Sequence, residues 1–275
     1  MGSAMIPADD YILGRSITDS VRLDAQHLLW KFHKGYELHP EIPVRNDMKI
    51  ADLGCGTGTW LLDLSRQLPP TVQLHGLDSS DQQYPPSGLW AKNMTFSVID
   101  LMSDLPPSLE GQYDVVHLRM WASNVRERET ATLIRQTKQL LKPGGYIQWE
   151  DADLHNQVTE GRVAEETAAR MSDLFRRVDL NYIWVSELPD RMREEDLEIV
   201  ESDHGRFAPP LMDLCTRTYI LALRELTQGI KRGLSGDILL SVSEQEVALQ
   251  CLATQQKEKI IYNWSPVTVL ARSRE

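Results

Sequence analysis

The chain has 275 residues, 41% of them apolar, and 29 lysines and arginines against 40 aspartates and glutamates give a net charge of −11. This composition supports a sizeable core, but no run approaches the roughly 20 apolar residues that span a bilayer, and no signal sequence is visible. The acidic balance disfavours duplex nucleic acid and large anionic substrates. Three scattered cysteines (55, 215 and 251) fit a reducing compartment, so we expect a cytoplasmic protein.

The N-terminal region predicts one long helix. Residues 1–4, before Met5, resemble an expression scar and are excluded. Residues 9–33 have the spacing of an amphipathic helix. Its apolar side chains fall on one side, which we expect to be buried: Leu13, Ile17, Val21, Leu28 and Leu29. We treat residues 5–45 as a helical lid segment.

The next segment reads as a strand, a glycine turn and a helix. The strand covers residues 48–53, the glycines stand at 54, 56 and 58, and the helix covers 60–67. Glycines permit a sharp turn and a close approach of the backbone to a ligand. A dinucleotide-binding loop would need its third glycine at position 59, which is Thr59. The spacing therefore disfavours a nicotinamide cofactor.

Four more strands follow in an alternating pattern with helices. They cover residues 71–77, 94–99, 113–118 and 146–149, and the last follows a helix at 131–141 and the breaker Lys142-Pro143-Gly144-Gly145. Asp78 ends the second strand, where a carboxylate can accept from both hydroxyls of a ribose, and Asp100 ends the third. This order predicts a doubly wound parallel α/β sheet with its ligand above the strand carboxyl ends. We assign residues 46–207 to this core.

The remainder predicts a cap and a completed sheet. Helices are expected at 162–179, 188–195 and 211–230, with another opening at Ser243, and a sixth strand at 197–207. Residues 259–272 contain two strand-like runs, of which 266–272 would form a seventh, antiparallel strand. We therefore expect a helical substrate cap at 208–257 and sheet completion at 258–275. The cap and the N-terminal helix should close over the pocket, because their apolar stripes fall outside the strand-helix repeats.

The glycine spacing after Asp52, the strand order and the Lys-Pro-Gly-Gly turn resemble class I S-adenosylmethionine-dependent methyltransferases. Arg15, the run Asp19 to His27 and the segment His117 to Met120 are similar to fungal small-molecule methyltransferases of secondary metabolism. The resemblance implies a seven-stranded Rossmann-like sheet with S-adenosylmethionine as cofactor. Cys55 departs from the threonine common in the family. The cofactor-binding residues implied are Asp52, Gly54, Gly56, Gly58, Asp78, Ser79, Asp100, Leu101 and Arg119, with Asp100 on the adenine amino group.

The sequence indicates the acceptor site less clearly than the cofactor site, because methyl transfer chiefly requires alignment of the acceptor and exclusion of water. A hydroxyl acceptor would need a base, and our candidate is His155, in the acidic run after the fifth strand. His117 is expected to be a core residue, and His27 either reaches the pocket or packs the helix. Asp151 and Asp153 form the only close acidic pair beside the pocket, without further ligands, so we expect no metal and activity that survives EDTA.

Four functions fit these observations to different degrees. The first is methyl transfer to a small-molecule acceptor. The second is a regulatory protein of the same fold, since the fungal family includes methyltransferase-like regulators of secondary metabolism. The third is a fold recruited to non-methylating chemistry such as a cyclisation. The fourth, a nicotinamide dehydrogenase, is weakened by the glycine spacing. The acceptor atom and the oligomeric state stay open.

Overall fold

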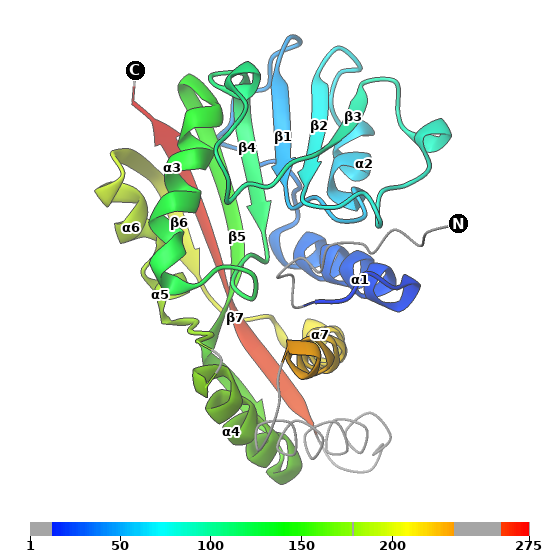
Figure 1. The fold of residues 1–275 in the computed structure, drawn as a ribbon, viewed down its shortest axis with the longest axis vertical. Coiled ribbons are helices and arrows are strands. Elements are labelled where there is room, and N and C mark those ends of the chain that lie inside the picture. The colour runs from blue at the N-terminus through cyan, green and yellow to red at the C-terminus, as the bar shows by residue number, and fades with distance from the viewer. Residues whose placement is uncertain (1–12, 178, 234–259, 275) are drawn as a thin grey trace.

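The computed structural model describes residues 13–177, 179–233 and 260–274, and its centre is a seven-stranded sheet in the order β3-β2-β1-β4-β5-β7-β6 (Figure 1). The strands are β1 (Lys49–Leu53), β2 (Gln73–Asp78), β3 (Met94–Val98), β4 (Tyr113–Arg119), β5 (Leu141–Glu160), β6 (Leu197–His204) and β7 (Ile261–Ser273). The first five strands run parallel, and β7 runs antiparallel to both β5 and β6. The predicted doubly wound sheet with an antiparallel seventh strand is confirmed.

Helices cover both faces of the sheet because its central strands are apolar on both sides. They are α1 (Ile17–Lys34), α2 (Thr59–Ser65), α3 (Thr130–Leu140), α4 (Arg162–Arg177), α5 (Ile183–Ser186), α6 (Leu188–Glu194) and α7 (Met212–Gly233). On β1, Ile50 packs in the core cluster that includes Trp60 of α2, and the next residue, Ala51, packs in the cluster that includes Leu133 of α3. Adjacent strand residues thus face opposite helical layers. Among the described residues, none of the helices could span a membrane.

The parallel strands all end on the side of the sheet where α1 and α7 lie (Figure 1). In the register of the central strands, Ile50 of β1 stands beside Leu74 of β2 and Val115 of β4. Their carboxyl ends therefore meet at one edge, which α1 covers. This is the edge at which the sequence places the ligand.

The structure differs from the sequence prediction in the length of two strands. β5 continues to Glu160, so the acidic run from Glu150 to His155 lies within the strand instead of after it. β7 is one continuous strand through Pro266 instead of two runs. The two lengthen together, because their antiparallel pairing extends from Tyr146 and Arg272 out to Glu160 and Ile261. The helix expected from Ser243 lies outside the described residues.

The N-terminal helix buries only part of the side that the sequence predicts: Leu13 and Leu29 are buried, but Leu28 is exposed. Within the described residues the helix begins at Ile17, and Ser16 and Asp19 form a capping box at its start. Ile17 and Val21, expected to be buried, are 83% and 61% exposed. The buried side instead carries mostly polar residues: Asp19, Arg22, Gln26, His27, Leu29 and Trp30. Polar residues can be buried here because their partners lie in the site described below.

The turn between β1 and α2 depends on glycine. Gly54, Gly56 and Gly58 have φ angles of 66°, 51° and 69°, a region that other residues seldom adopt. A Cβ on Gly54 would stand 3.0 Å from the ring of Trp121, and one on Gly58 would stand 2.6 Å from the ring of Phe96. The turn is fixed to the next strand, because the amides of Gly54 and Cys55 donate to the carbonyl of Leu77.

We expect Gly58→Ala to lower the free energy of unfolding by roughly 1–3 kcal/mol, from the strained φ and the displaced Phe96 ring. Gly88→Ala is the matched control, because a Cβ there meets nothing within 4 Å. It should change stability by less than about 0.5 kcal/mol. Urea unfolding of the two variants measures the difference. Equal stabilities would contradict the glycine requirement at the turn.

Candidate functional site

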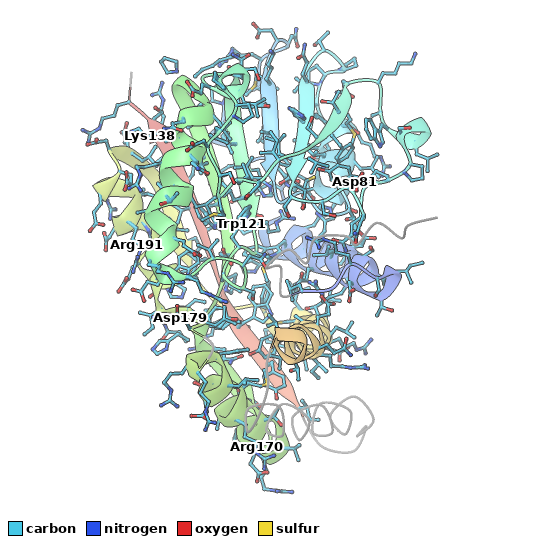
Figure 2. All side chains as sticks on the ribbon, in the orientation of Figure 1. Asp81, Trp121, Lys138, Arg170, Asp179 and Arg191 are labelled. Carbon is cyan, nitrogen blue, oxygen red and sulfur yellow. The ribbon has the colours of Figure 1, made fainter. Side chains whose placement is uncertain are left out.

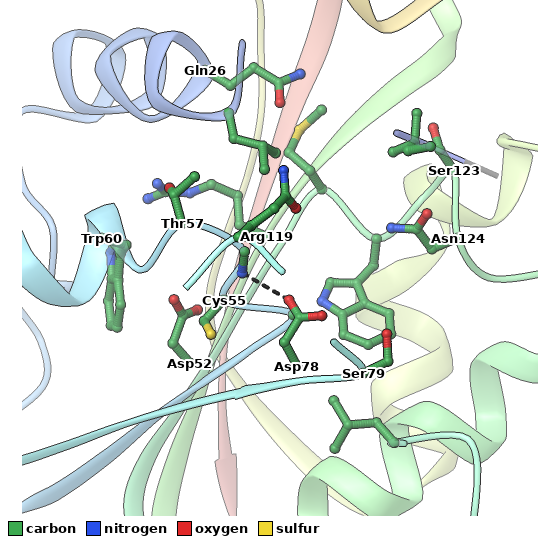
Figure 3. A pocket seen from close by; sticks show the side chains of 18 of the residues that line it. Gln26, Asp52, Cys55, Thr57, Trp60, Asp78, Ser79, Arg119, Ser123 and Asn124 are labelled. Carbon is green, nitrogen blue, oxygen red and sulfur yellow. Dashed lines mark hydrogen bonds between the residues drawn. The ribbon is translucent and has the colours of Figure 1, made fainter. Parts of the chain in front are cut away.

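A cavity of about 650 Å³ lies at the carboxyl ends of β1, β2 and β4, under α1 (Figure 3). Eight of the nine predicted cofactor residues line it: Asp52, Gly54, Gly56, Asp78, Ser79, Asp100, Leu101 and Arg119. Gly58 does not line the cavity and serves as the N-cap of α2. The resemblance thus identified residues from four segments that fold into one cavity.

Two acidic side chains offer oxygen acceptors on the side of β2 and β3. Asp78 Oδ2 accepts from the amide of Gly56 at 2.8 Å, the dashed line in Figure 3. Burial raises the pKa of Asp78, against the hydrogen bonds from the amides of Gly56 and Ser80. Asp100 is exposed and accepts from the amide of Met102 at 2.9 Å. Each carboxylate keeps lone pairs for a ligand, because each oxygen can accept more than one hydrogen bond.

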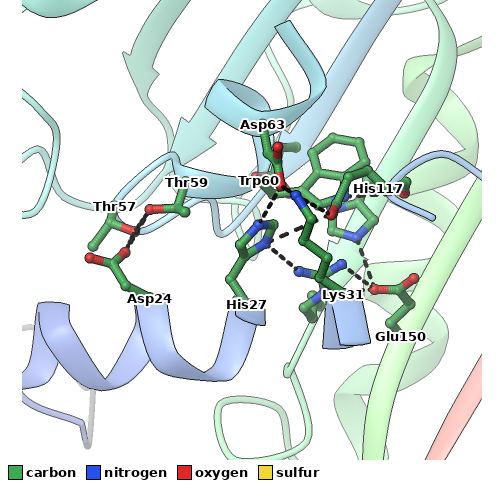
Figure 4. Close-up of polar contacts among 12 residues, drawn as sticks. Asp24, His27, Lys31, Thr57, Thr59, Trp60, Asp63, His117 and Glu150 are labelled. Carbon is green, nitrogen blue, oxygen red and sulfur yellow. Dashed lines mark hydrogen bonds and ion pairs between the residues drawn. The ribbon is translucent and has the colours of Figure 1, made fainter. Parts of the chain in front are cut away.

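Helix α1 is fastened directly to the glycine turn. Asp24 Oδ1 accepts from the hydroxyls of Thr57 and Thr59, at 2.7 and 2.6 Å (Figure 4). The side chain of Leu23 lies 3.1 Å from the Cβ position of Gly56. The helix therefore forms one wall of the cavity, where Arg22, Gln26 and His27 also lie. Of these, sequence reasoning considered only His27, and left its role open.

A buried charge network forms the floor between β1, β4 and β5. Arg119 Nε donates to Glu150 Oε2 at 2.6 Å, and His117 Nδ1 stands 2.7 Å from Asp52 Oδ1 and its Nε2 3.5 Å from Glu150. Trp60 stacks on the His117 ring at 3.8 Å. Burial works to raise the pKa of Glu150, but the Arg119 charge and the His117 contacts lower it to about 2. Burial lowers the pKa of His117, but Asp52 and Glu150 raise it overall. His117 is buried, as expected, and also borders the cavity.

A second polar cluster joins α1 to α2 and the segment after α1 (Figure 4). His27 Nε2 lies 3.2 Å from Asp63 Oδ2, and its Nδ1 lies 3.1 Å from Arg119 Nη1. A guanidinium can only donate, so Nδ1 accepts and Nε2–H donates to Asp63. Burial and the Arg119 charge lower the pKa of His27, which keeps the ring neutral. Lys31 forms ion pairs with both Asp63 and Glu37.

This cluster has the geometry of a cation site but already contains a cation. Donor atoms of His27, Glu37 and Asp63 lie within 4.8 Å of one another. The ammonium of Lys31 pairs with both carboxylates, so a metal ion would have to displace it. Sequence spacing missed the cluster because its three residues come from α1, a loop and α2. The expectation of no metal stays a prediction.

The acidic pair singled out in the sequence does not face the cavity. Asp151 accepts hydrogen bonds from the amides of Trp121 and Ala122 and from the indole of Trp149. It therefore holds the loop after β4 in place. Burial raises the pKa of Asp151 to about 6, against these hydrogen bonds. Asp153 accepts from Asn156 and pairs with His204 instead.

The candidate base is placed away from the first cavity. His155 is exposed and lines a separate cavity of about 430 Å³, which is also bordered by α4 and by Tyr219 of α7. Its side chain is absent from the lining of the cavity that contains Asp78 and Asp100. The geometry thus gives no support to His155 as a base for chemistry beside the glycine turn. The reason is the extension of β5, which carries His155 past that cavity.

Glu37 generates a pH prediction, because both of its oxygens are buried and lack a hydrogen-bond partner among the described residues. Burial raises its pKa to about 7, against the charges of Arg119 and Lys31, while Asp63 reinforces the rise. A carboxyl pKa that is higher in the folded state costs stability as pH rises from about 4.5 to about 7. Glu37→Gln mimics the protonated form. We expect its stability relative to wild type to rise by up to roughly 3 kcal/mol between pH 5 and pH 8.

Urea unfolding at four pH values across this range measures the effect. Glu41→Gln, an exposed position on the same loop, controls for the loss of one negative charge. A difference between Glu37→Gln and wild type that stays constant with pH would contradict the assignment of a raised pKa to the buried carboxyl of Glu37.

Comparison with known proteins agrees with this geometry. Residues 50–145 match the methyltransferase domain family. Methyltransferase grgD of a Penicillium species is 33% identical over 175 residues, which cover 61% of this chain and 60% of that protein. N-methyltransferase tcpN of Claviceps purpurea is 32% identical over 179 residues, covering 64% and 62%. The chain thus matches about three fifths of the length of these relatives.

A solved structure supports the fold. A chain of the complex between the Haloferax volcanii Trm112 methyltransferase activator and the putative methyltransferase is 16% identical, with a TM-score of 0.55. The match covers 94% of this chain and 96% of that chain. At this identity the likeness concerns the fold alone. Taken with the strand order, these findings show that residues 50–145 belong to a methyltransferase domain of the class I S-adenosylmethionine-dependent fold and that the chain is related in sequence to fungal methyltransferases.

Proposed function

We propose that this protein transfers a methyl group from S-adenosylmethionine to a small-molecule acceptor of fungal secondary metabolism. The observation that carries the proposal is the convergence of the glycine turn, Asp78 and Asp100 on one cavity. When bound, the cofactor supplies a methyl group activated by a sulfonium charge. The chain supplies binding, alignment and exclusion of water, which are the main requirements of this chemistry.

The cavity is suited to the parts of this cofactor. Gly54 and Gly56 line the cavity, and without side chains they let a ligand approach the loop backbone closely. We propose that Asp78 accepts from the ribose hydroxyls and that Asp100 and Leu101 border the adenine. We assign Asp52, Ser79 and Arg119 to the same site.

The charges around the cavity favour a cation over a dinucleotide. Asp52, Asp78, Asp100 and Glu129 line it, against two cationic side chains, Arg22 and Arg119. Both arginines are already paired, Arg22 with Glu225 and Arg119 with Glu150. Among the described lining residues, the arginines are thus already engaged, so a pyrophosphate would enter a negative field, whereas a sulfonium is favoured.

Helices α1 and α7 are our candidates for the lid. Arg22 on α1 donates to both oxygens of Glu225 on α7, at 2.5 and 2.7 Å, and both side chains are buried. Ala222 of α7 also lines the cavity. This pairing supports the proposal that residues 5–45 and 208–257 cover the cofactor, although residues 234–257 lie outside the described part.

We further propose that the acceptor atom is a nitrogen. Among the described residues, the two histidines on the cavity, His27 and His117, have their ring nitrogens turned toward Asp63, Arg119, Asp52 and Glu150. This arrangement leaves neither histidine well placed as a base, so a neutral amine that needs only alignment fits better than a hydroxyl. The name of the relative tcpN, an N-methyltransferase, agrees with this choice.

Cofactor binding gives the first test. We expect calorimetry to show binding of S-adenosylmethionine and S-adenosylhomocysteine, and none of NAD. Asp78→Ala should weaken binding by roughly 1.5–3 kcal/mol, the range for a hydrogen bond to a charged group. Asp81→Ala, at an exposed acid nearby (Figure 2), is the matched control and should bind as wild type does. Tighter binding of NAD than of S-adenosylmethionine would contradict the proposal. Equal cofactor affinities of the two variants would show that Asp78 does not contact the cofactor.

Turnover gives the second test. We expect formation of S-adenosylhomocysteine when a panel of heteroaromatic amines is offered, and slower or no turnover of the matching alcohols, because neither described histidine on the cavity is turned toward an acceptor. Chelation with EDTA should leave the rate unchanged, since Lys31 already occupies the acidic cluster. A preference for the alcohols would refute the nitrogen acceptor, and reversible loss of turnover under chelation would refute the metal-free mechanism.

A further inference from the structure

The cavity of about 430 Å³ that His155 borders has no part in the cofactor site described above. Its lining residues come from the distal part of β5, from α4, from the segment 179–183 and from Tyr219 of α7. Figure 1 shows where β5, α4 and α7 lie in the fold. Its volume is within the range of cavities that hold small molecules. Its residues are separate from those of the first cavity, so the two can be tested independently.

The buried walls of this second cavity are apolar and aromatic, whereas the charged residues of its lining, Arg176 and Asp179, are exposed. Phe175, Tyr182 and Tyr219 line it and are each at most 6% exposed. The rings of Phe175 and Tyr182 contact edge to face, with centroids 5.4 Å apart. Burial raises the pKa of Tyr182 to about 12 and that of Tyr219 further, so both phenols stay uncharged. Flat, uncharged walls of this kind suit an aromatic ring.

One polar group in this cavity lacks a partner. Gln157 lines the cavity and donates through Nε2 to the hydroxyl of Tyr219 at 3.2 Å. Its Oε1 is buried and accepts no hydrogen bond from the residues that the structure describes. A buried oxygen of this kind is costly to leave unpaired. An N–H group on a ligand in the cavity would satisfy it.

The two cavities share a wall. The hydroxyl of Tyr182, on the second cavity, lies 3.4 Å from that of Ser123, on the first. On α7, Tyr219 borders the second cavity and Ala222, three residues on, borders the first. A molecule seated in the second cavity would therefore lie beside the acceptor side of the first.

We infer that the second cavity binds a flat aromatic ring that carries an N–H donor to Gln157, as the part of the acceptor remote from the methylated atom. The role of this ring as part of the acceptor rests on the proposed function. The binding of an aromatic ring in the second cavity does not. His155 stands at the cavity as a lining residue, which gives the acidic run of β5 an acceptor-side role without making His155 a base.

The test uses indole as the probe, with the full chain, in the presence and absence of S-adenosylhomocysteine. Benzofuran, which has the same shape without the N–H, is the matched probe. We expect indole to bind with a dissociation constant of roughly 0.1–5 mM, by calorimetry or ligand-observed NMR, and benzofuran to bind about 5–10-fold more weakly. Gln157→Leu should remove the difference between the two probes.

A cavity-filling variant supplies the decisive comparison. Ala168→Trp introduces an indole ring from α4 into the cavity, whereas Ala169→Trp makes the same change at an exposed position beside it. Indole affinity should fall at least tenfold in the first variant and stay at the wild-type value in the second. S-Adenosylhomocysteine affinity, unchanged in both, shows that they are folded.

Two results would overturn the inference. The first is no detectable binding at indole concentrations up to 10-fold above the upper expected dissociation constant. The second is an equal affinity of indole for the Ala168→Trp and wild-type proteins. Failure of the proposed function is distinguishable, because it would appear as loss of S-adenosylhomocysteine binding to the wild-type chain, while the indole measurements would be unaffected.

Discussion

The buried pair of Arg119 and Glu150 is the interaction on which the rest of the site depends. Glu150 is fully buried, and its carboxylate is compensated by Arg119 and faced by His117. Leaving either partner alone in this environment would cost several kcal/mol, so the pair fixes the end of β4 to the middle of β5. Arg119 then extends to His27 on α1. The buried charge of Glu150 thus positions Arg119, and Arg119 in turn contacts α1 over the cavity.

This dependence explains why α1 buries its polar side. Arg22, Gln26 and His27 point inward because Glu225, Arg119 and Asp63 provide partners there. Apolar periodicity alone places Ile17 and Val21 on the buried side with Leu29, since it assumes that the core contacting a helix is itself apolar. The run from Asp19 to His27 was noticed as part of the family resemblance, but periodicity could not show that its polar residues make the contacts.

The sheet was predictable because its signals are local. Each parallel strand is an apolar run bounded by a turn, and the order of the runs along the chain prescribes the doubly wound topology. The glycine turn was equally local, and its three positive φ angles are those that its residue types allow. The nine cofactor assignments depended on position after these strands, and eight of them meet in one cavity.

The features that could not be predicted all join distant segments. The cluster of His27, Lys31, Glu37 and Asp63 forms only when α1 and the segment after it pack against α2. The length of β5 was missed because the residues after Trp149 alternate too weakly to be read as a strand without their partner β7. Pairing with β7 stabilises this part of β5 as a strand. As a consequence, His155 lies far along an extended strand.

Because β5 and β7 are extended, the first cavity and the second cavity lie at different parts of the sheet. The parallel half of the sheet provides the glycine turn and the carboxylates, whose positions are fixed by backbone geometry. The extended antiparallel half, with α4 and α7, forms the second cavity from side chains alone. Substitutions such as Ala168→Trp can change that cavity without touching the glycine turn. Under the proposed function, an arrangement of this kind would let the acceptor specificity vary while the chemistry beside the glycine turn is kept, because different residues line the two cavities.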